Sequence, residues 1–410
     1  MRFNKKNYLI VTLFIGFVLQ YNFLFSAEFL WLNFWSGSGI RTSISFFVIF
    51  LCLLPYSIGL NLKFRAWSVI PALLIYVIYG FTIGLLSNTP SLGMIAEGIF
   101  WLEIALYFVI LNNLDRESLS SLIQAILIYS ALNAIASIGY FWLIKDQIAV
   151  AALVGDQRIV RIADLLSPLL ALLYILYNSI YLEKKLSTAW LIPLILLILL
   201  GMFRSVWAAF ILSYIFTNLL FPTLDGFKKM ITNTVTALVV ILIFEQIFEH
   251  FFSVESVIIG RIIAGIGTED SLGRISSAGD VFSQFINEPF SIIFGAGYGK
   301  LVWFVNDFGD GEVLALQPLG SLSNFYIVFL YQVGIFVAMA YLLYTIYCLF
   351  WIGSRYSKSN ARLLTFVGLY FFLQWLTFPT SIHYPIAIII GIYFTLATNI
   401  MPTRTTNTNQ

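Results

Sequence analysis

The sequence predicts an all-α integral membrane protein with about 12 transmembrane helices and one large periplasmic loop that contains short helices. Three observations lead to this class. Of the 410 residues, 60% are hydrophobic and only 10% are charged, and the mean hydropathy is +0.92; soluble proteins have roughly 25% charged residues. Apolar runs long enough to cross a bilayer recur along the chain. Basic residues gather in alternate connections between these runs.

Each long apolar run is predicted to be a spanning helix. A span needs roughly 20 apolar residues, because a helix rises about 1.5 Å per residue through about 30 Å of hydrocarbon. Only Arg204 interrupts the stretch 189–221, which is too long for one span, so we divide it there. The predicted spans are 8–26, 43–60, 67–86, 93–111, 122–143, 165–181, 189–203, 204–221, 231–248, 324–351, 363–378 and 382–400.

The charge distribution orients these spans. Cytoplasmic connections are enriched in Lys and Arg, and placing both termini in the cytoplasm puts most of the 22 basic residues there. We therefore expect a multi-pass protein of the bacterial inner membrane. Its expected parts are helices one to nine in 1–249, a large periplasmic loop in 250–323, the last three helices in 324–401, and a cytoplasmic tail in 402–410.

Several classes of function are disfavoured by what the sequence lacks. A net charge of +2 gives no reason to expect nucleic acid as a partner. Cys52 and Cys348 lie in apolar runs, and neither HExxH nor CxxC occurs, so we expect no metal site and no cofactor. The glycine-rich segment 295–300 lacks the strand-before, helix-after context of a phosphate-binding loop, so we interpret it as a tight turn.

Four arginines on the predicted outer side are candidates for binding an anion. Arg204 has no polar loop beside it, and an ionisable group so close to hydrocarbon is a functional candidate; snorkelling to the interface is the alternative. Arg158 and Arg161 share one face of a helical turn, and Arg274 lies in the large loop. Guanidinium groups pair bidentately with phosphate oxygens, so the four residues suit a lipid-linked diphosphate. Intramolecular pairing with nearby aspartates is the alternative.

The order of three motifs resembles the bacterial O-antigen polymerase and O-antigen ligase superfamily, over roughly residues 150–340. The first motif is Arg-Ser-Val-Trp-Ala at 204–208. The second is Arg274 followed by Pro and Gly-Ala-Gly-Tyr-Gly within 289–299. The third is Ser-Asn at the start of 323–334, which ends in Gly. Each motif is short, and the resemblance rests on their order and spacing.

This resemblance implies a metal-independent glycosyltransferase that polymerises undecaprenyl-diphosphate-linked repeat units into a surface polysaccharide. Arg204, Arg274 and the Arg158/Arg161 pair are then expected to hold diphosphate. Asp280 first, and Glu288 second, are expected to act as the catalytic base. The expected partners are the lipid-linked glycan, membrane lipids and a chain-length regulator protein.

Two alternatives to the polymerase stay open. Ligases of the superfamily depend on a histidine where this chain has Ser323, which favours a polymerase over a ligase that transfers glycan to the lipid A core. A polysaccharide flippase or transporter is the second alternative. Such a protein is expected to have paired charges and broken helices near the middle of the membrane, whereas the polar residues here concentrate in one outer loop.

Overall fold

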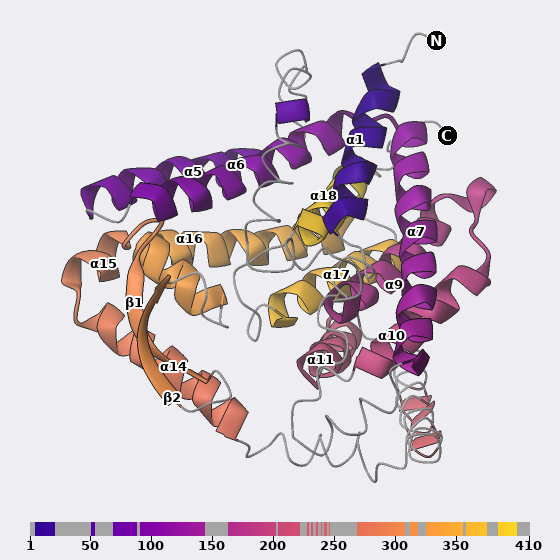
Figure 1. Cartoon of the computed structure of the whole chain (residues 1–410). Helices are drawn as coiled ribbons and strands as arrows, with labels where there is room; N and C mark the ends of the chain where they lie inside the picture. The colour runs from indigo at the N-terminus through magenta and orange to yellow at the C-terminus, as the bar shows by residue number, and fades with distance from the viewer. Residues whose placement is uncertain are drawn as a thin grey trace, which may run out of the picture.

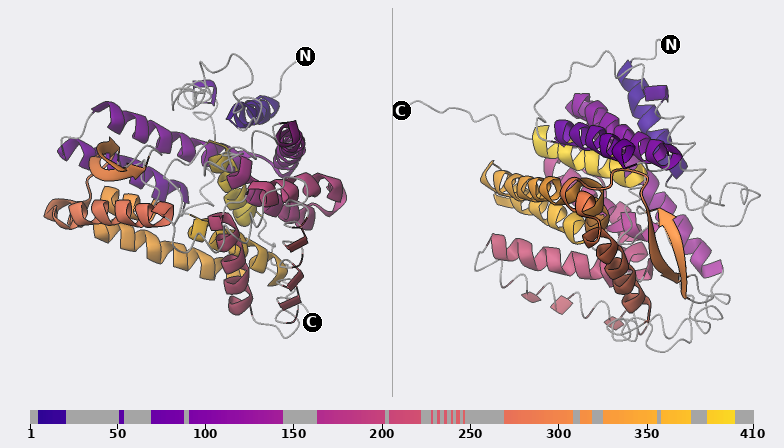
Figure 2. Two further views of the ribbon diagram at one scale, coloured as in Figure 1. Left: turned by 60° about the horizontal axis from the view of Figure 1, so that its bottom comes forward. Right: turned by 90° about the vertical axis from the view of Figure 1, so that its left-hand side faces the viewer.

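The computed structural model is mostly helical (Figures 1 and 2). Spans predicted at 43–60 and 231–248, the tail 402–410, and Arg158 and Arg161 lie wholly or largely outside the residues that it describes. The described residues are 5–20, 51–53, 69–87, 91–143, 163–201, 204–221, 269–307, 312–318, 325–355, 358–374 and 384–399, with isolated residues between 228 and 246.

Each predicted span that is described at length contains a helix, and the expected break in 189–221 is confirmed at Arg204. Among the described helices, two segments are long and apolar enough to cross a membrane by length and composition, Arg116–Gly139 and Tyr326–Tyr344, and the second contains the turn at Gly334 described below. The helices are α1 (Lys5–Gln20), α5 (Val69–Leu86), α6 (Ser91–Asn113), α7 (Arg116–Leu143), α9 (Ala163–Ile180), α10 (Leu191–Gly201), α11 (Arg204–Leu220), α16 (Phe325–Arg355), α17 (Lys358–Gln374) and α18 (Tyr384–Asn399).

These helices share one continuous apolar core. Helices α5, α6 and α16 run side by side, whereas α7 is steeply inclined to them (Figure 1). Two loops that the charge pattern assigns to the cytoplasm lie together, because the Arg116 guanidinium donates to the Ile180 carbonyl at 3.3 Å and Lys184 pairs with Glu117 at 3.5 Å. At another predicted cytoplasmic position, Arg362 of α17 donates to the Asn218 side chain of α11. The predicted sidedness is thus compatible with the packing.

Helix α16 folds back on itself at Gly334. This residue has φ 73° and ψ 172°, which is not helical. The rings of Phe329 and Tyr341 are 5.2 Å apart, although twelve positions of continuous helix would separate them by about 18 Å. The single span predicted at 324–351 is therefore two helices, which we call α16a (325–333) and α16b (335–355). At about 31 Å, α16b alone is long enough to cross a bilayer, and α16a is less than half that length.

The predicted outer loop contains both helices and strands. The amphipathic helix expected at 271–288 is confirmed as α14 (Glu269–Ile286), and a short helix α15 (Pro289–Phe294) follows it. Strands β1 (Leu301–Asp307) and β2 (Glu312–Pro318) then form an antiparallel pair, so the expectation of an all-α chain is wrong here. The start of β1 has the alternating exposure of a strand with one buried face, since Val302 is buried whereas Trp303 is half exposed. Figure 1 shows the hairpin lying along α14.

Candidate functional site

The glycine-rich turn after α15 inserts between α5 and α16 and completes the hydrogen bonding of the broken helix. The turn at Gly334 leaves carbonyl groups in the last turn of α16a without partners within that helix. The amide of Ala296 donates to the Tyr331 carbonyl at 2.7 Å, and the amide of Gly297 donates to the Gln332 carbonyl at 3.0 Å. The segment 295–299 therefore acts as the cap of α16a. This extends the tight-turn interpretation and leaves these two amides unavailable to a phosphate.

Tyr298 anchors this turn in α5. Its ring is fully buried, and its hydroxyl donates to the Tyr76 carbonyl at 3.1 Å while its amide donates to the Gly80 carbonyl at 3.2 Å. A Cβ at Gly80 would lie 2.4 Å from the Tyr298 ring, so only glycine admits the ring at this position. The Tyr76 hydroxyl in turn donates to Gln332 Oε1 at 2.7 Å. Turn, α5 and α16a are thus connected by one buried network.

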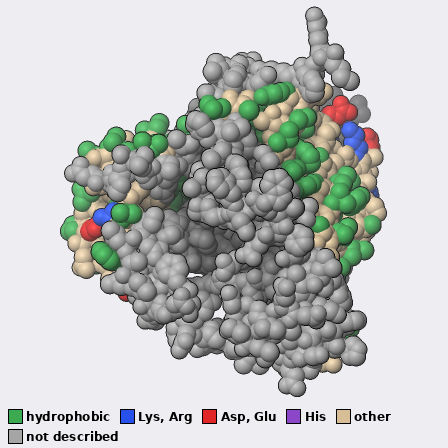
Figure 3. Space-filling view, viewed as in Figure 1, with side chains coloured by type: hydrophobic (Ala, Val, Ile, Leu, Met, Phe, Trp, Pro, Cys, Tyr) green, Lys and Arg blue, Asp and Glu red, His purple; other side chains and the backbone are tan. Residues whose placement is uncertain are grey.

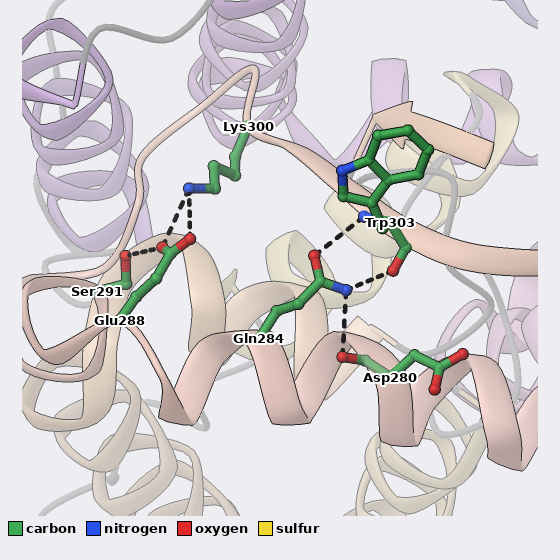
Figure 4. Close-up of polar contacts among 6 residues, drawn as sticks. All are labelled: Asp280, Gln284, Glu288, Ser291, Lys300 and Trp303. Carbon is green, nitrogen blue, oxygen red and sulfur yellow. Dashed lines mark hydrogen bonds and ion pairs between the residues drawn. The ribbon is translucent and has the colours of Figure 1, made fainter. Parts of the chain in front are cut away.

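Glu288 and Lys300 form an ion pair across the base of this insertion (Figure 4). Lys300 Nζ lies 2.9 Å from Glu288 Oε1 and 3.0 Å from Oε2, and the Ser291 hydroxyl donates to Oε2 at 2.7 Å. Glu288 precedes the first residue of α15 and Lys300 precedes β1, so the pair joins two residues that are twelve positions apart in the sequence. The Lys300 ammonium also lies 5.8 Å from the centre of the Tyr331 ring.

The environment of Glu288 stabilises its charged form. Burial by itself would raise the pKa of this carboxyl, but the hydrogen bonds from Lys300 and Ser291 and the positive charge of Lys300 outweigh it, so the pKa lies below the ordinary value. A general base needs a pKa near the working pH. The ion pair therefore favours a structural role for Glu288.

Asp280 lies on α14, two turns before Glu288, and its carboxylate points away from the Glu288–Lys300 pair (Figure 4). Its backbone carbonyl accepts hydrogen bonds from the side chains of Ser283 and Gln284. The Gln284 amide also binds both backbone groups of Trp303, accepting from its amide at 3.0 Å and donating to its carbonyl. The structure thus fixes α14 against β1 and leaves the Asp280 carboxylate on a different side.

The structure describes the backbone of two of the arginine candidates, Arg204 and Arg274. Arg204 is the first residue of α11, as the sequence predicts, and Arg274 lies within α14. Six positions separate Arg274 from Asp280, which puts them about 120° apart around the helix. The two positions therefore do not share one face of α14.

The start of α11 and the start of α16a lie at the same end of α17. Helices α11 and α17 are antiparallel, since Asn218 meets Arg362 at one end and the Phe210 ring lies 6.2 Å from Tyr370 further along. Close to that second region, the Tyr326 hydroxyl donates to the Phe372 carbonyl at 2.7 Å. The elements that carry the first and third sequence motifs are therefore brought to one region by α17.

Sequence reasoning missed the roles of Lys300, Tyr298 and Gly334. Lys300 was part of the glycine-rich segment, but nothing in the sequence pairs it with Glu288. Gln332 and Gly334, a polar residue and a glycine inside an apolar run, were the available signal of a broken helix. Within the ranges that the structure describes, no group of three or more His, Cys, Asp or Glu side chains lies close enough to hold a metal ion.

In comparisons with protein-family models, curated proteins and solved structures, the chain matches none of them. The resemblance to the O-antigen polymerase and ligase superfamily therefore stays a prediction from the three motifs.

Proposed function

We propose that the chain is a multi-pass membrane glycosyltransferase that polymerises undecaprenyl-diphosphate-linked repeat units at the outer face of the bacterial inner membrane. The observation that carries this proposal is the position of α11 and α16a. Two motifs more than one hundred residues apart in the sequence, one beginning at Arg204 and one ending at Gly334, lie on elements that meet the same end of α17. The second motif lies on α14, α15 and the glycine-rich turn that follows them, and both helices contact α16.

Exposed apolar surface supports the membrane placement. Side chains such as Ile78 on α5 and Phe336 on α16b are 65% and 70% exposed, and extensive apolar surface of this kind is typical of a face that contacts lipid or another protein. Hydrophobic side chains cover much of the described face in Figure 3, with few charges among them. The proposed topology keeps twelve spans with both termini in the cytoplasm, with α16b as the tenth span.

The proposed chemistry uses the carrier diphosphate as the leaving group. The glycan breaks its bond to the diphosphate and forms a bond to a hydroxyl of the acceptor sugar, and the hydroxyl proton passes to a base. Arg204, with Arg274 and the Arg158/Arg161 pair, stabilises the charge that develops on the diphosphate. Asp280 accepts the proton, because Glu288 is held by Lys300.

Substitution of Arg204 tests the proposal. In a deletion strain, the Arg204→Ala variant should fail to restore long-chain glycan on a gel, because one charged contact to a leaving group contributes roughly 2–4 kcal/mol to lowering the barrier. The Arg204→Lys variant keeps the charge but loses the planar guanidinium, so it should be markedly impaired. The matched control is Lys228→Ala, an exposed residue on the opposite predicted side, which should restore full chain length.

Membrane levels of each variant are compared by blot. A fully active Arg204→Lys variant would show interfacial anchoring in place of diphosphate binding. Lipid-linked polymer that accumulates without transfer to lipid A in the deletion strain would replace the polymerase with the ligase.

One observation favours a second function, a flippase or transporter for a lipid-linked glycan. Helix α16 is broken at Gly334, and broken helices are typical of transporter binding sites. In that case the deletion strain should accumulate single lipid-linked repeat units on the cytoplasmic side of the membrane. A polymerase defect should leave single repeats transferred to the surface.

A further inference from the structure

The helices of the outer segment carry an apolar face that no described element covers. Phe282 and Ile286 on α14 and Phe290, Ile293 and Phe294 on α15 are all exposed; we call these five residues the outer apolar band. The adjacent face of α14, about 100° around the helix, is buried, with Val281 and Phe285 in a small core with Val328 and Tyr331 of α16a. An apolar face of this kind, on which the Phe290 and Phe294 rings lie 5.2 Å apart, is unfavourable in water and marks an interaction surface.

The packing of α16a sets the level of this band relative to the membrane. The exposed apolar surface of α16b begins directly after the turn, at Ile335 and Phe336, so the turn at Gly334 lies near the outer boundary of the hydrocarbon. From that turn α16a runs back among the spans, since Phe329 reaches Tyr76 of α5 at 5.5 Å and Tyr326 reaches α17. Helix α16a therefore lies at the depth of the outer leaflet.

Helix α14 packs against α16a below the level of the turn. The rings of Phe285 and Tyr331 are 5.2 Å apart, and Tyr331 lies three positions inside the turn, which corresponds to about 5 Å along the helix. Residues next to Phe285, Phe282 and Ile286 among them, share this depth. A hydrocarbon leaflet is about 15 Å thick, so the α14 part of the band lies within it, and the α15 part lies at its outer edge, because the Ile293 carbonyl oxygen adjoins Gly334.

We propose that α14 and α15 are seated in the outer leaflet, with the outer apolar band against lipid acyl chains and α16a behind them as a re-entrant half-helix. Backbone that is not in a spanning helix is tolerated at this depth only where protein satisfies its hydrogen bonds. The glycine-rich turn meets this condition, because Ala296, Gly297 and Tyr298 all donate to neighbouring helices. The Glu288–Lys300 ion pair neutralises the two charges that adjoin this surface.

This inference rests on the membrane placement proposed above and is independent of the enzymatic reaction. It is tested with single cysteines in the full chain, with Cys52 and Cys348 replaced by alanine. Ile286→Cys and Ile293→Cys report on the band, and Asn287→Cys, an exposed polar residue in the turn directly after α14, is the matched control. Ile78→Cys reports on a predicted span. Each cysteine carries a bimane fluorophore, and the protein is reconstituted in phosphatidylcholine vesicles.

Two quenchers then separate lipid from water. Nitroxide on the acyl chains should quench bimane at 286, 293 and 78 several-fold more than at 287, and aqueous iodide should show the opposite order. Equal iodide quenching at 286 and 287, with nitroxide effective only at 78, would overturn the seating of α14 and α15 while leaving the membrane placement intact. Weak nitroxide quenching at 78 as well would overturn the membrane placement itself. The substituted side chains are exposed, so a monodisperse elution profile is expected for every variant.

Discussion

Substituting Gly297 with alanine should unseat the glycine-rich turn and destabilise the whole chain. The new Cβ would lie 2.1 Å from the Gly84 nitrogen, 2.6 Å from the Gly84 Cα and 2.7 Å from the Gly80 carbonyl oxygen. These are backbone atoms of a helix, so no side-chain rotation relieves the overlap. Gly297 also has φ +71°, a conformation that costs an L-residue about 1–2 kcal/mol.

The expected loss of stability follows from these two terms. Forcing extra volume into a packed site costs about 1–3 kcal/mol, so Gly297→Ala should lower the free energy of unfolding by about 2–5 kcal/mol in total. The matched control is Gly279→Ala on α14, where a Cβ meets nothing within 4 Å. Alanine in a helix is favoured over glycine by about 1 kcal/mol, so this variant should be as stable as the natural chain or more so.

Thermal unfolding of the purified protein in detergent, followed by the fluorescence of its 10 tryptophans, measures both variants. The reasoning predicts a midpoint several degrees lower for Gly297→Ala and an unchanged or higher midpoint for Gly279→Ala. If Gly297→Ala unfolds together with the natural chain, the turn does not lie against α5, and the account of the capped helix fails with it.

Three further predictions concern the ion pair and the folded-back helix. Lys300→Met should destabilise the protein by about 1 kcal/mol, the usual upper range for a partly exposed pair. Glu288→Gln in the same background should recover part of this loss. Equal thermal unfolding midpoints for Lys300→Met and the natural chain would show that the pair contributes nothing. Because the pKa of Glu288 is lowered by folding, the pair stabilises the protein fully above the ordinary carboxyl pKa, and this contribution is lost as the pH falls through the lower folded value. The difference between the natural chain and Lys300→Met should therefore shrink as the pH is lowered below the ordinary carboxyl pKa, and a difference that does not change with pH would contradict this assignment. A short bifunctional thiol reagent should crosslink cysteines at 329 and 341 in a chain without its native cysteines, and peptide mass spectrometry identifies the product. A pair of cysteines at 329 and 347 should not be crosslinked. Failure of the first pair to react would favour one continuous helix.

Periodicity and hydropathy predicted the helices because both are local properties of the chain. The predicted break at Arg204 and the amphipathic helix α14 are of this kind, since a charged residue between apolar runs and a helical spacing of apolar residues are visible in the sequence. The hairpin β1–β2 was missed because its strands pair with each other and β1 packs against α14. Contacts of this kind leave only a weak pattern in the local sequence.

The return of α16 and the pairing of Glu288 with Lys300 depend on contacts between segments that are distant in sequence. An apolar run of the length of 324–351 is compatible with one span, and only the backbone conformation of Gly334 divides it. Similarly, a glutamate twelve positions before a lysine gives no sign of an ion pair until α15 and the glycine-rich turn bring them together. Side chains such as Arg204 remain sequence candidates whose roles are proposals.

The double hydrogen bond between Gln284 and Trp303 has a consequence for the solubility of the outer segment. An outer strand edge offers free amide and carbonyl groups to any other extended chain, which is a common route to aggregation. By occupying both backbone groups of Trp303, one side chain of α14 takes the place of a third strand. The edge of β1 that faces away from β2 is thereby closed to pairing at this position without extending the sheet.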